Sequence, residues 1–239
     1  MKYLYGPVKS RRLGFSLGLS LTPYKVCTFD CIYCQLQGTS TKTAERKEYI
    51  NTREVLGELK TWLENNAEQV KTLNYITISG SGEPTLNIKI GELIAQIKKL
   101  TTAPLAVITN ASLLSDRVVR SDISKADLIV PSLDAATDAV FARIDRPLPA
   151  IKVEDVIRGL VALRQEYRGK IWLEVMLIAG VNDDLRHIKR IKEALDRINP
   201  DKIQLNSPVR SSAQLNLRVV SEAKLRKIKS LLGEKCEII

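Results

Sequence analysis

The chain has 239 residues, 44% of them apolar and 27% charged, and a formal net charge of +10. This composition is typical of a soluble globular protein and excludes an intrinsically disordered chain. No run of eighteen apolar residues occurs, which excludes a membrane-spanning helix. With only four cysteines, three of them clustered, it is not a secreted disulfide framework, and we expect a cytoplasmic protein with no membrane partner.

Short apolar runs alternate with longer helical patterns along the chain. The runs typical of strands are 15–21, 75–79, 106–109, 128–131, 171–178 and 202–205, and helical patterns follow at about 53–71, 88–100, 116–124, 153–167, 185–198 and 222–232. Such alternation predicts an α/β fold built on a parallel sheet. Six units suit either a partial (β/α)6 barrel or a doubly wound sheet. No linker or repeat interrupts them, so we expect residues 1–239 to form one domain.

The loop after the first predicted strand, residues 23–38, carries Cys27, Cys31 and Cys34 in the spacing C-x3-C-x2-C. Cysteine thiolates bind iron–sulfur clusters, and an electron-transfer cluster normally takes four of them, so three leave one iron open. A redox pair of Cys31 and Cys34 would leave Cys27 unexplained. A zinc site would need Cys236 or His187, both remote in sequence, as its fourth ligand. We therefore interpret this cysteine loop as a three-cysteine cluster site.

This spacing, with Tyr33 directly before the last cysteine, resembles the signature of the radical S-adenosylmethionine (SAM) enzymes. The resemblance favours the partial barrel and implies a [4Fe–4S] cluster on Cys27, Cys31 and Cys34, with SAM chelating the open iron. It also implies reductive cleavage of SAM to a 5′-deoxyadenosyl radical, which abstracts a substrate hydrogen, and a one-electron donor of the flavodoxin or ferredoxin type. Tyr33 would place a backbone group near the adenine.

The loop after the second predicted strand reads Ser-Gly-Ser-Gly-Glu-Pro-Thr over residues 79–85. Gly80 and Gly82 allow the backbone to approach a ligand closely. The loop resembles the radical SAM Gly-Gly-Glu motif with Ser81 in place of the first glycine. By that match these residues bind SAM, and Glu83 accepts a hydrogen bond from its amino group. A glycine-rich turn before a helix is the alternative reading.

Polar residues at the ends of the next two predicted strands are further candidates for binding SAM or substrate: Asn110, Ser132 and Asp134. Each could instead be a helix cap or a turn former. In the fifth strand, Glu174 either points into the barrel and contacts substrate or forms a salt bridge to a neighbouring lysine. Three arginines in the later connections could bind a carboxylate or phosphate, with solvent exposure as the alternative: Arg143, Arg146 and Arg210.

The chain as a whole resembles a group of radical SAM oxidoreductases related to the tRNA wyosine-synthesis enzymes. Residues 6–14, 23–25, 82–86, 131–135 and 180–183 carry this resemblance. The chain departs from the group at Leu148, where the family pattern has histidine, and it has no second cysteine cluster.

The excess positive charge has two readings, solvated helix faces or a surface that attracts a polyanion. Together with the wyosine resemblance it favours modification of a tRNA or RNA base. The alternatives are a glycyl-radical-type activating enzyme acting on a protein and a non-catalytic iron–sulfur electron-transfer protein. No catalytic side chain apart from the cofactor ligands can be assigned from the sequence.

Overall fold

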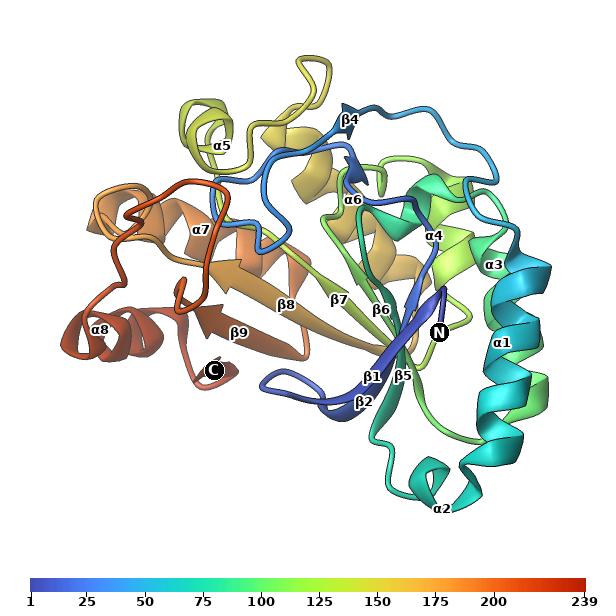
Figure 1. Cartoon of the computed structure of the whole chain (residues 1–239). Helices are drawn as coiled ribbons and strands as arrows, with labels where there is room; N and C mark the ends of the chain where they lie inside the picture. The colour runs from blue at the N-terminus through green and yellow to red at the C-terminus, as the bar shows by residue number, and fades with distance from the viewer.

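The computed structural model describes all residues 1–239 and is built around one eight-stranded sheet (Figure 1). Its strands, in spatial order, are β1 (Leu4–Ser10), β2 (Gly14–Ser20), β5 (Tyr75–Ser79), β6 (Leu105–Thr109), β7 (Leu128–Pro131), β8 (Lys170–Met176), β9 (Lys202–Asn206) and β10 (Cys236–Ile238). All neighbours from β2 to β10 pair in parallel. The spatial order follows the chain and never reverses, so the fold is a partial (β/α)6 barrel and not a doubly wound sheet.

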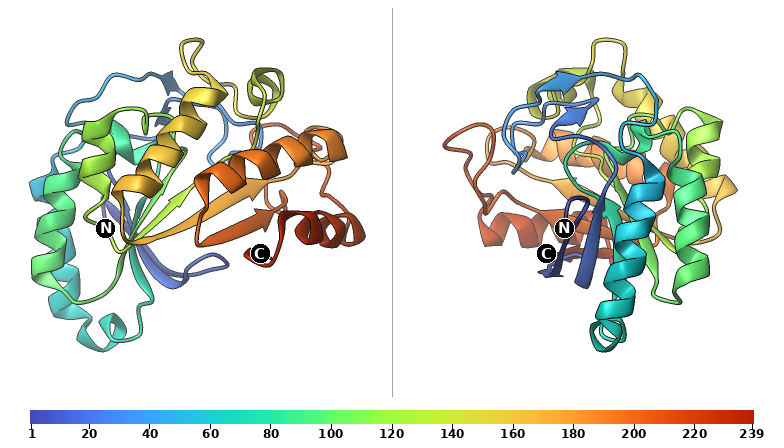
Figure 2. Two further views of the ribbon diagram at one scale, coloured as in Figure 1. Left: turned by 180° about the vertical axis from the view of Figure 1, so that it is seen from behind. Right: turned by 45° about the vertical axis from the view of Figure 1, so that its right-hand side comes forward.

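Helices cover the outer face of this curved sheet (Figure 2). They are α1 (Thr52–Asn65), α2 (Ala67–Val70), α3 (Ile90–Leu100), α4 (Arg117–Ile123), α5 (Asp138–Ile144), α6 (Val153–Glu166), α7 (Leu185–Ile198) and α8 (Glu222–Leu232). A 3-10 turn (Pro84–Leu86) and a two-stranded pair, β3 (Val26–Cys27) with β4 (Thr41–Lys42), complete the chain. None of the helices combines the length and the apolar character needed to cross a bilayer.

The strands separate two environments by the alternation of their side chains. On β2, Leu17 and Leu19 are fully buried in the core between sheet and helices, whereas Ser16 and Gly18 line the barrel interior. The parallel strands from β5 to β9 follow the same rule, because successive residues of a strand point to opposite faces. The outer core is continuous and contains 52 buried apolar residues.

Three features differ from the sequence-based expectation or resolve it. Strand β1 was not predicted; it pairs antiparallel with β2, and its sequence, LYGPVKS, buries only its first residue and so shows no apolar alternation. Helix α5 was also missed, since seven residues give too short a periodic pattern. The C-terminal run Cys236–Ile239, for which the sequence allows either a short edge strand or a disordered tail, forms the edge strand β10, which pairs with β9.

The turn between β1 and β2, residues 10–14, closes the amino-terminal end of the barrel. This hairpin tip lies beside the C-terminus in Figures 1 and 2, and Arg11 Nη1 donates to the Ile239 carbonyl (3.3 Å). Gln204 of β9 donates to the Arg12 carbonyl (3.3 Å). Leu13 fills the bottom of the interior in a small apolar cluster with three strand residues, Ala106, Leu128 and Val130. The hairpin tip therefore bridges the open side of the partial barrel.

Candidate active site

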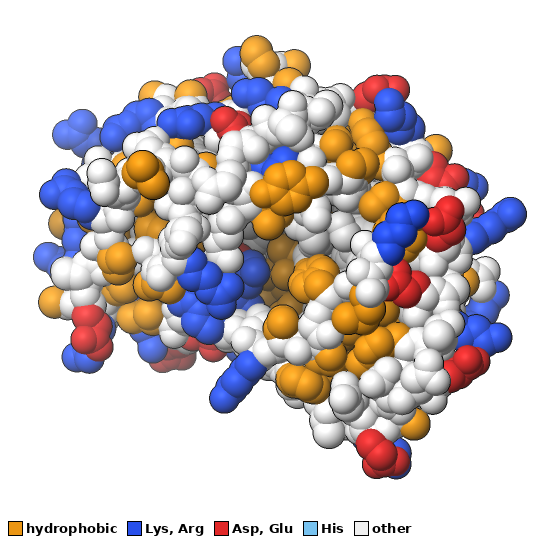
Figure 3. All heavy atoms as spheres, in the orientation of Figure 1, with side chains coloured by type: hydrophobic (Ala, Val, Ile, Leu, Met, Phe, Trp, Pro, Cys, Tyr) orange, Lys and Arg blue, Asp and Glu red, His pale blue; other side chains and the backbone are white.

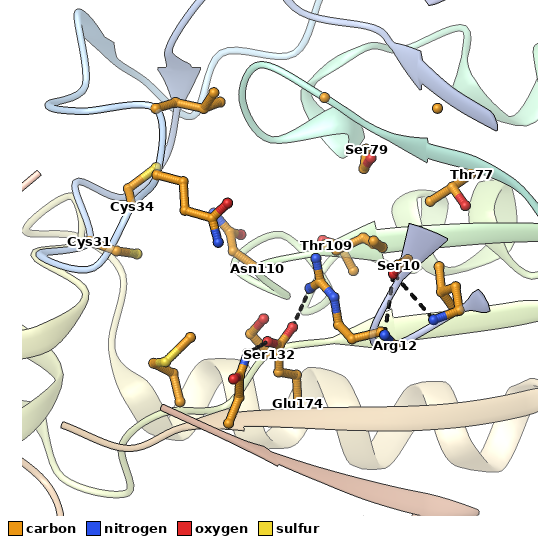
Figure 4. Close-up of a pocket in the computed structure, with 18 of the residues that line it drawn as sticks. Ser10, Arg12, Cys31, Cys34, Thr77, Ser79, Thr109, Asn110, Ser132 and Glu174 are labelled. Carbon is orange, nitrogen blue, oxygen red and sulfur yellow. Dashed lines mark hydrogen bonds and ion pairs between the residues drawn. The ribbon is translucent and has the colours of Figure 1, made fainter. Parts of the chain in front are cut away.

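The barrel encloses a central cavity of about 620 Å³. It is visible as the hollow in Figure 3, and the close-up in Figure 4 shows its walls. The cysteine loop forms one end of the cavity and the hairpin tip reaches the other, with the inner faces of the strands between them. The volume lies within the range of small-molecule sites, about 300–1,000 Å³.

The three clustered cysteines share this cavity. Cys27, Cys31 and Cys34 all line it and are half-buried free thiols, whereas Cys236 lies in β10 and His187 in α7, outside the lining. Nowhere in the 239 residues do three His, Cys, Asp or Glu side chains converge tightly enough for a single metal ion. The three clustered thiols therefore share one cavity, and the two candidates for a fourth zinc ligand lie outside it.

Three remote segments hold the cysteine loop in shape through backbone hydrogen bonds. They are the glycine-rich loop, the segment after α5 and the loop after β9. The donors and acceptors are Lys25 N to Ser81 O (2.6 Å), Glu83 N to Val26 O (3.1 Å), Asp30 N to Asp145 O (3.0 Å), Ile32 N to Ile144 O (2.9 Å), Ala213 N to Cys34 O (2.9 Å) and Gln214 N to Ile32 O (2.9 Å). The conformation of the cysteine loop thus depends on tertiary contacts with these three segments.

Each clustered thiol has a polar neighbour. Lys25 Nζ donates to Cys34 Sγ (2.9 Å), Asn110 Nδ2 lies 3.5 Å from Cys27 Sγ, and Cys31 Sγ donates to Asp145 Oδ1 (3.3 Å). Burial raises the pKa of Cys27 to about 11 and the pKa of Cys31 well above its ordinary value. Without a metal the neutral thiol is favoured at both positions; a bound metal cation would make the thiolates favourable.

Sequence analysis missed Lys25 and Asp145. Lys25 is 2% exposed, although its position beside Pro23 and Tyr24 suggests an ordinary surface lysine. Asp145 is 3% exposed and reaches Cys31 from the end of α5. No local signal identifies either, because each contact depends on how distant segments pack.

Glu83 is buried and held by four donors. Its Oε1 accepts from Thr85 N (3.1 Å), Thr85 Oγ1 (2.6 Å) and Thr109 Oγ1 (2.7 Å), and its Oε2 accepts from Asn110 N (2.8 Å). Burial raises the pKa of Glu83, and these hydrogen bonds oppose that rise. Two carboxylate oxygens offer about four acceptor positions, and Oε2 accepts only one bond from the protein. Since Glu83 lines the cavity, this oxygen can accept one donor from a ligand.

The glycines of the glycine-rich loop make close contacts with other parts of the protein. A Cβ on Gly82 would lie 1.9 Å from the Val26 carbonyl, and Gly80 has a φ of +94° with Ser20 beside it. Their smallness thus lets this loop pack against the cysteine loop and β2. Both glycines line the cavity, but Ser81 does not.

A buried acidic group lies beside Tyr33. The Tyr33 hydroxyl donates to Asp134 Oδ2, and Met176 N donates to Asp134 Oδ1 (2.7 Å). Burial raises the pKa of Asp134 to about 7 and also raises the pKa of the neighbouring Asp145. Tyr33 and Asp134 both line the cavity, with the Tyr33 hydroxyl already committed to Asp134.

Asn110 and Ser132 differ in whether their side chains already make hydrogen bonds to the protein. Asn110 lines the cavity with its side-chain amide bound to Thr28 Oγ1 (2.7 Å). Ser132 lines the same cavity; its backbone N donates to the Thr109 carbonyl (3.0 Å), and its hydroxyl makes no hydrogen bond to the protein. Of the pair, only Ser132 offers an uncommitted side-chain group to a ligand.

Glu174 points into the barrel, and its ion-pair partner is an arginine, not a neighbouring lysine. It lines the cavity, as a lumen-facing carboxylate would, and forms an ion pair with Arg12 of the hairpin tip. Asn206 Nδ2 donates to its other oxygen (3.0 Å). The partner is an arginine 162 residues earlier in the chain, which sequence analysis did not identify.

The arginines of the later connections divide in the same way. Arg210 lines the cavity and donates to Gln35 Oε1 (3.2 Å). Arg143 donates to the Gly180 carbonyl (3.2 Å) and Arg146 to Gln214 Oε1 (2.8 Å), and neither lines the cavity. Only Arg210 of the three can therefore meet a ligand there.

Comparison with known proteins identifies a protein family, relatives of similar sequence and a solved structure with a similar fold. Residues 21–195 match the family model described as the radical SAM superfamily. A UPF0026 protein of Methanocaldococcus jannaschii is 31% identical over 98% of this chain and 72% of its own length. A protein named GTPase Obg from Brachyspira hyodysenteriae is 38% identical over 99% of this chain, which spans only 34% of that relative. The solved structure of TYW1 with a lysine-pyruvate adduct bound superposes with a TM-score of 0.64 at 21% identity, over 91% of this chain and 72% of that one.

Proposed function

Because the chain belongs to the radical SAM superfamily, and within it to the UPF0026 proteins, we propose that it holds a [4Fe–4S] cluster on Cys27, Cys31 and Cys34 and cleaves SAM beside it. The observation that carries this proposal is the convergence of the three thiols and an available Glu83 oxygen on one cavity. We also propose that residues 1–239 act as one radical SAM core domain, which the unbroken strand order supports.

When bound, the cluster and SAM would supply one-electron chemistry for hydrogen-atom abstraction from the substrate. The protein binds and orients SAM. Glu83 Oε2 would accept from the SAM amino group. The Ser132 hydroxyl and the Asn110 backbone carbonyl would contact the nucleoside part, and the Tyr33 backbone would support the adenine. Gly80 and Gly82 keep the SAM-binding loop against the cysteine loop, and Ser81 contributes through its backbone.

For the substrate, we propose a base in tRNA or another RNA. The resemblance to wyosine-synthesis enzymes and the net charge of +10 support this choice. A one-electron donor of the flavodoxin or ferredoxin type would reduce the cluster. A protein substrate, as for a glycyl-radical activating enzyme, is the second candidate, which the size of the chain and its one cysteine cluster favour.

The test is anaerobic reconstitution with iron and sulfide, followed by incubation with SAM and dithionite and measurement of 5′-deoxyadenosine. Reactions without dithionite and without iron serve as controls. We expect 5′-deoxyadenosine only in the complete reaction, and more of it when unmodified tRNA is added. No 5′-deoxyadenosine under any condition would contradict the enzymatic proposal. Product formation that tRNA does not stimulate would contradict the RNA substrate and favour the second candidate.

A further inference from the structure

Arg12 is a cation placed inside the barrel by the hairpin tip. Figure 4 shows its side chain reaching across to Glu174, with Cys31 and Cys34 on the other side of the cavity. Its Nη1 pairs with Glu174 Oε2, and neither Nε nor Nη2 donates a hydrogen bond to the protein. A guanidinium has five N–H donors in a fixed fork, so most of those of Arg12 remain for a ligand.

Glu174 orients the Arg12 guanidinium but leaves most of its hydrogen-bond donors free. The Glu174 side chain is 7% exposed and accepts from Asn206 on its other oxygen, whereas the Arg12 side chain is 32% exposed. A buried carboxylate with two fixed partners holds one arm of the guanidinium in place. The free arm, with its donors, is left in the cavity, which is the arrangement that bidentate recognition of an oxyanion requires.

Other cations gather at the same end of the cavity. Lys9 and Arg11 line it next to Arg12, and neither forms an ion pair with an acidic side chain. Arg210 also lines the cavity, but at the cysteine end, where it donates to Gln35. The remaining acidic lining residues, Glu83 and Asp134, lie toward the cysteine loop and accept hydrogen bonds from the protein. Lys and Arg side chains border the hollow in Figure 3. The cavity thus has a cysteine end and a cationic end.

We propose that the substrate carries an oxyanion, a phosphate or a carboxylate, that binds Arg12 at the cationic end while its reacting carbon faces the cysteine end. This inference rests on the proposed function for the identity of the reaction, but the anion site stands on its own contacts. It restricts substrates to molecules with an anionic group that can enter the barrel. A nucleotide phosphate and a carboxylic acid share this chemistry.

The test measures binding of inorganic phosphate and of acetate, separately, by calorimetry to the reconstituted full chain saturated with SAM. We expect Arg12→Gln to weaken binding at least tenfold, and the control Arg158→Gln, which changes an exposed arginine of α6, to leave it unchanged. Tighter binding of phosphate identifies a phosphoryl substrate, and tighter binding of acetate identifies a carboxylic acid. No binding of either anion by the wild type, or equal binding by Arg12→Gln, overturns the proposal.

A second variant keeps the test valid if Arg12→Gln does not fold. Glu174→Gln keeps a side-chain oxygen that can accept from Arg12 and so hold it in place, but it removes the negative charge beside the anion site. We therefore expect the anion that the wild type prefers to bind at least threefold more tightly; unchanged or weaker binding contradicts the site. SAM cleavage without substrate, measured in parallel, separates the two proposals. Arg12-dependent anion binding without SAM cleavage would contradict the proposed function alone, and SAM cleavage without Arg12-dependent binding would contradict this inference alone.

Discussion

The two faces of the barrel sheet have different roles, one in stability and one in forming the candidate site. The outer face of β5 presents Ile76 and Ile78, both fully buried under the helices, while its inner face presents Thr77 and Ser79 to the cavity. Neighbouring residues of one strand thus serve different ends, since the outer face stabilises the fold and the inner face bears the site. Substitutions on the two faces should therefore differ in kind.

The largest effect we expect comes from the cavity side. Cys31→Ala should abolish iron binding and the visible absorbance of the cluster, because two thiols cannot replace three, while the free energy of unfolding of the metal-free chain changes little. Cys236→Ala, in the outer core at β10, is the matched control and should keep the iron. Iron analysis and urea unfolding give both readouts; full iron content in Cys31→Ala would contradict the ligand assignment.

Next in size is a change at the contact between the two loops. Gly82→Ala places a methyl group 1.9 Å from the Val26 carbonyl, so the cysteine loop must shift, and we expect loss of most of the iron together with lowered stability. Gly57→Ala is the control: no atom lies within 4 Å of its new Cβ, and alanine in mid-helix should stabilise α1 by about 1 kcal/mol. Equal iron content in the two variants would show that the close approach is unimportant.

A pair of neighbours on β5 tests the comparison directly. Ile78→Ala leaves a cavity in the outer core and should lower the free energy of unfolding by about 2–5 kcal/mol. Thr77→Val removes only the hydrogen bond to Ser16 on the inner face, so we expect a loss of about 1 kcal/mol. Urea denaturation of both variants measures the difference. If Thr77→Val proved the more damaging, stability would not reside mainly on the outer face.

The smallest effect concerns pH. Burial raises the pKa of Asp134 from 3.8 to about 7, so the fold favours its neutral form, and the stability that this gives is present below pH 4 and is lost as the pH rises through 7. Asp134→Asn should therefore lose less stability than the wild type between pH 5 and pH 8, measured by urea unfolding. The other groups facing it are Tyr33, Cys31, Asp145 and Glu174.

Asp145 keeps part of the pH dependence in that variant, because its pKa is raised in the same sense by burial and by Asp134. The double variant Asp134→Asn with Asp145→Asn should be flatter still. A steeper decline than in the wild type for either variant would mean that the sign of the shift is wrong.

Much of the fold could be predicted because it rests on local patterns. The alternation of leucine with serine and glycine on β2 and the six repeated strand–helix units are visible in the sequence, and they predicted a parallel α/β sheet. The choice of a partial barrel over a doubly wound sheet came from the family resemblance, and the strand order agrees with it. Strand β1 could not be predicted, since only its pairing with β2 makes it a strand.

The site was predictable in its motifs and not in its long-range contacts. Cys27 and Glu83 lie in recognisable loops, and both line the cavity. The ion pair of Arg12 with Glu174 and the approach of Asp145 to Cys31 join residues more than one hundred positions apart. Such contacts depend on the closure of the whole barrel, which no local spacing encodes.

The hydrogen bonds from Ala213 and Gln214 to the cysteine loop have a consequence for how the protein is made. A chain is synthesised from its N-terminus, and its early segments begin to fold first. The backbone around Ile32 and Cys34 meets two of its partners only when residues 213 and 214 have left the ribosome. The cysteine loop therefore reaches its final conformation late in translation, about 180 residues after its own synthesis.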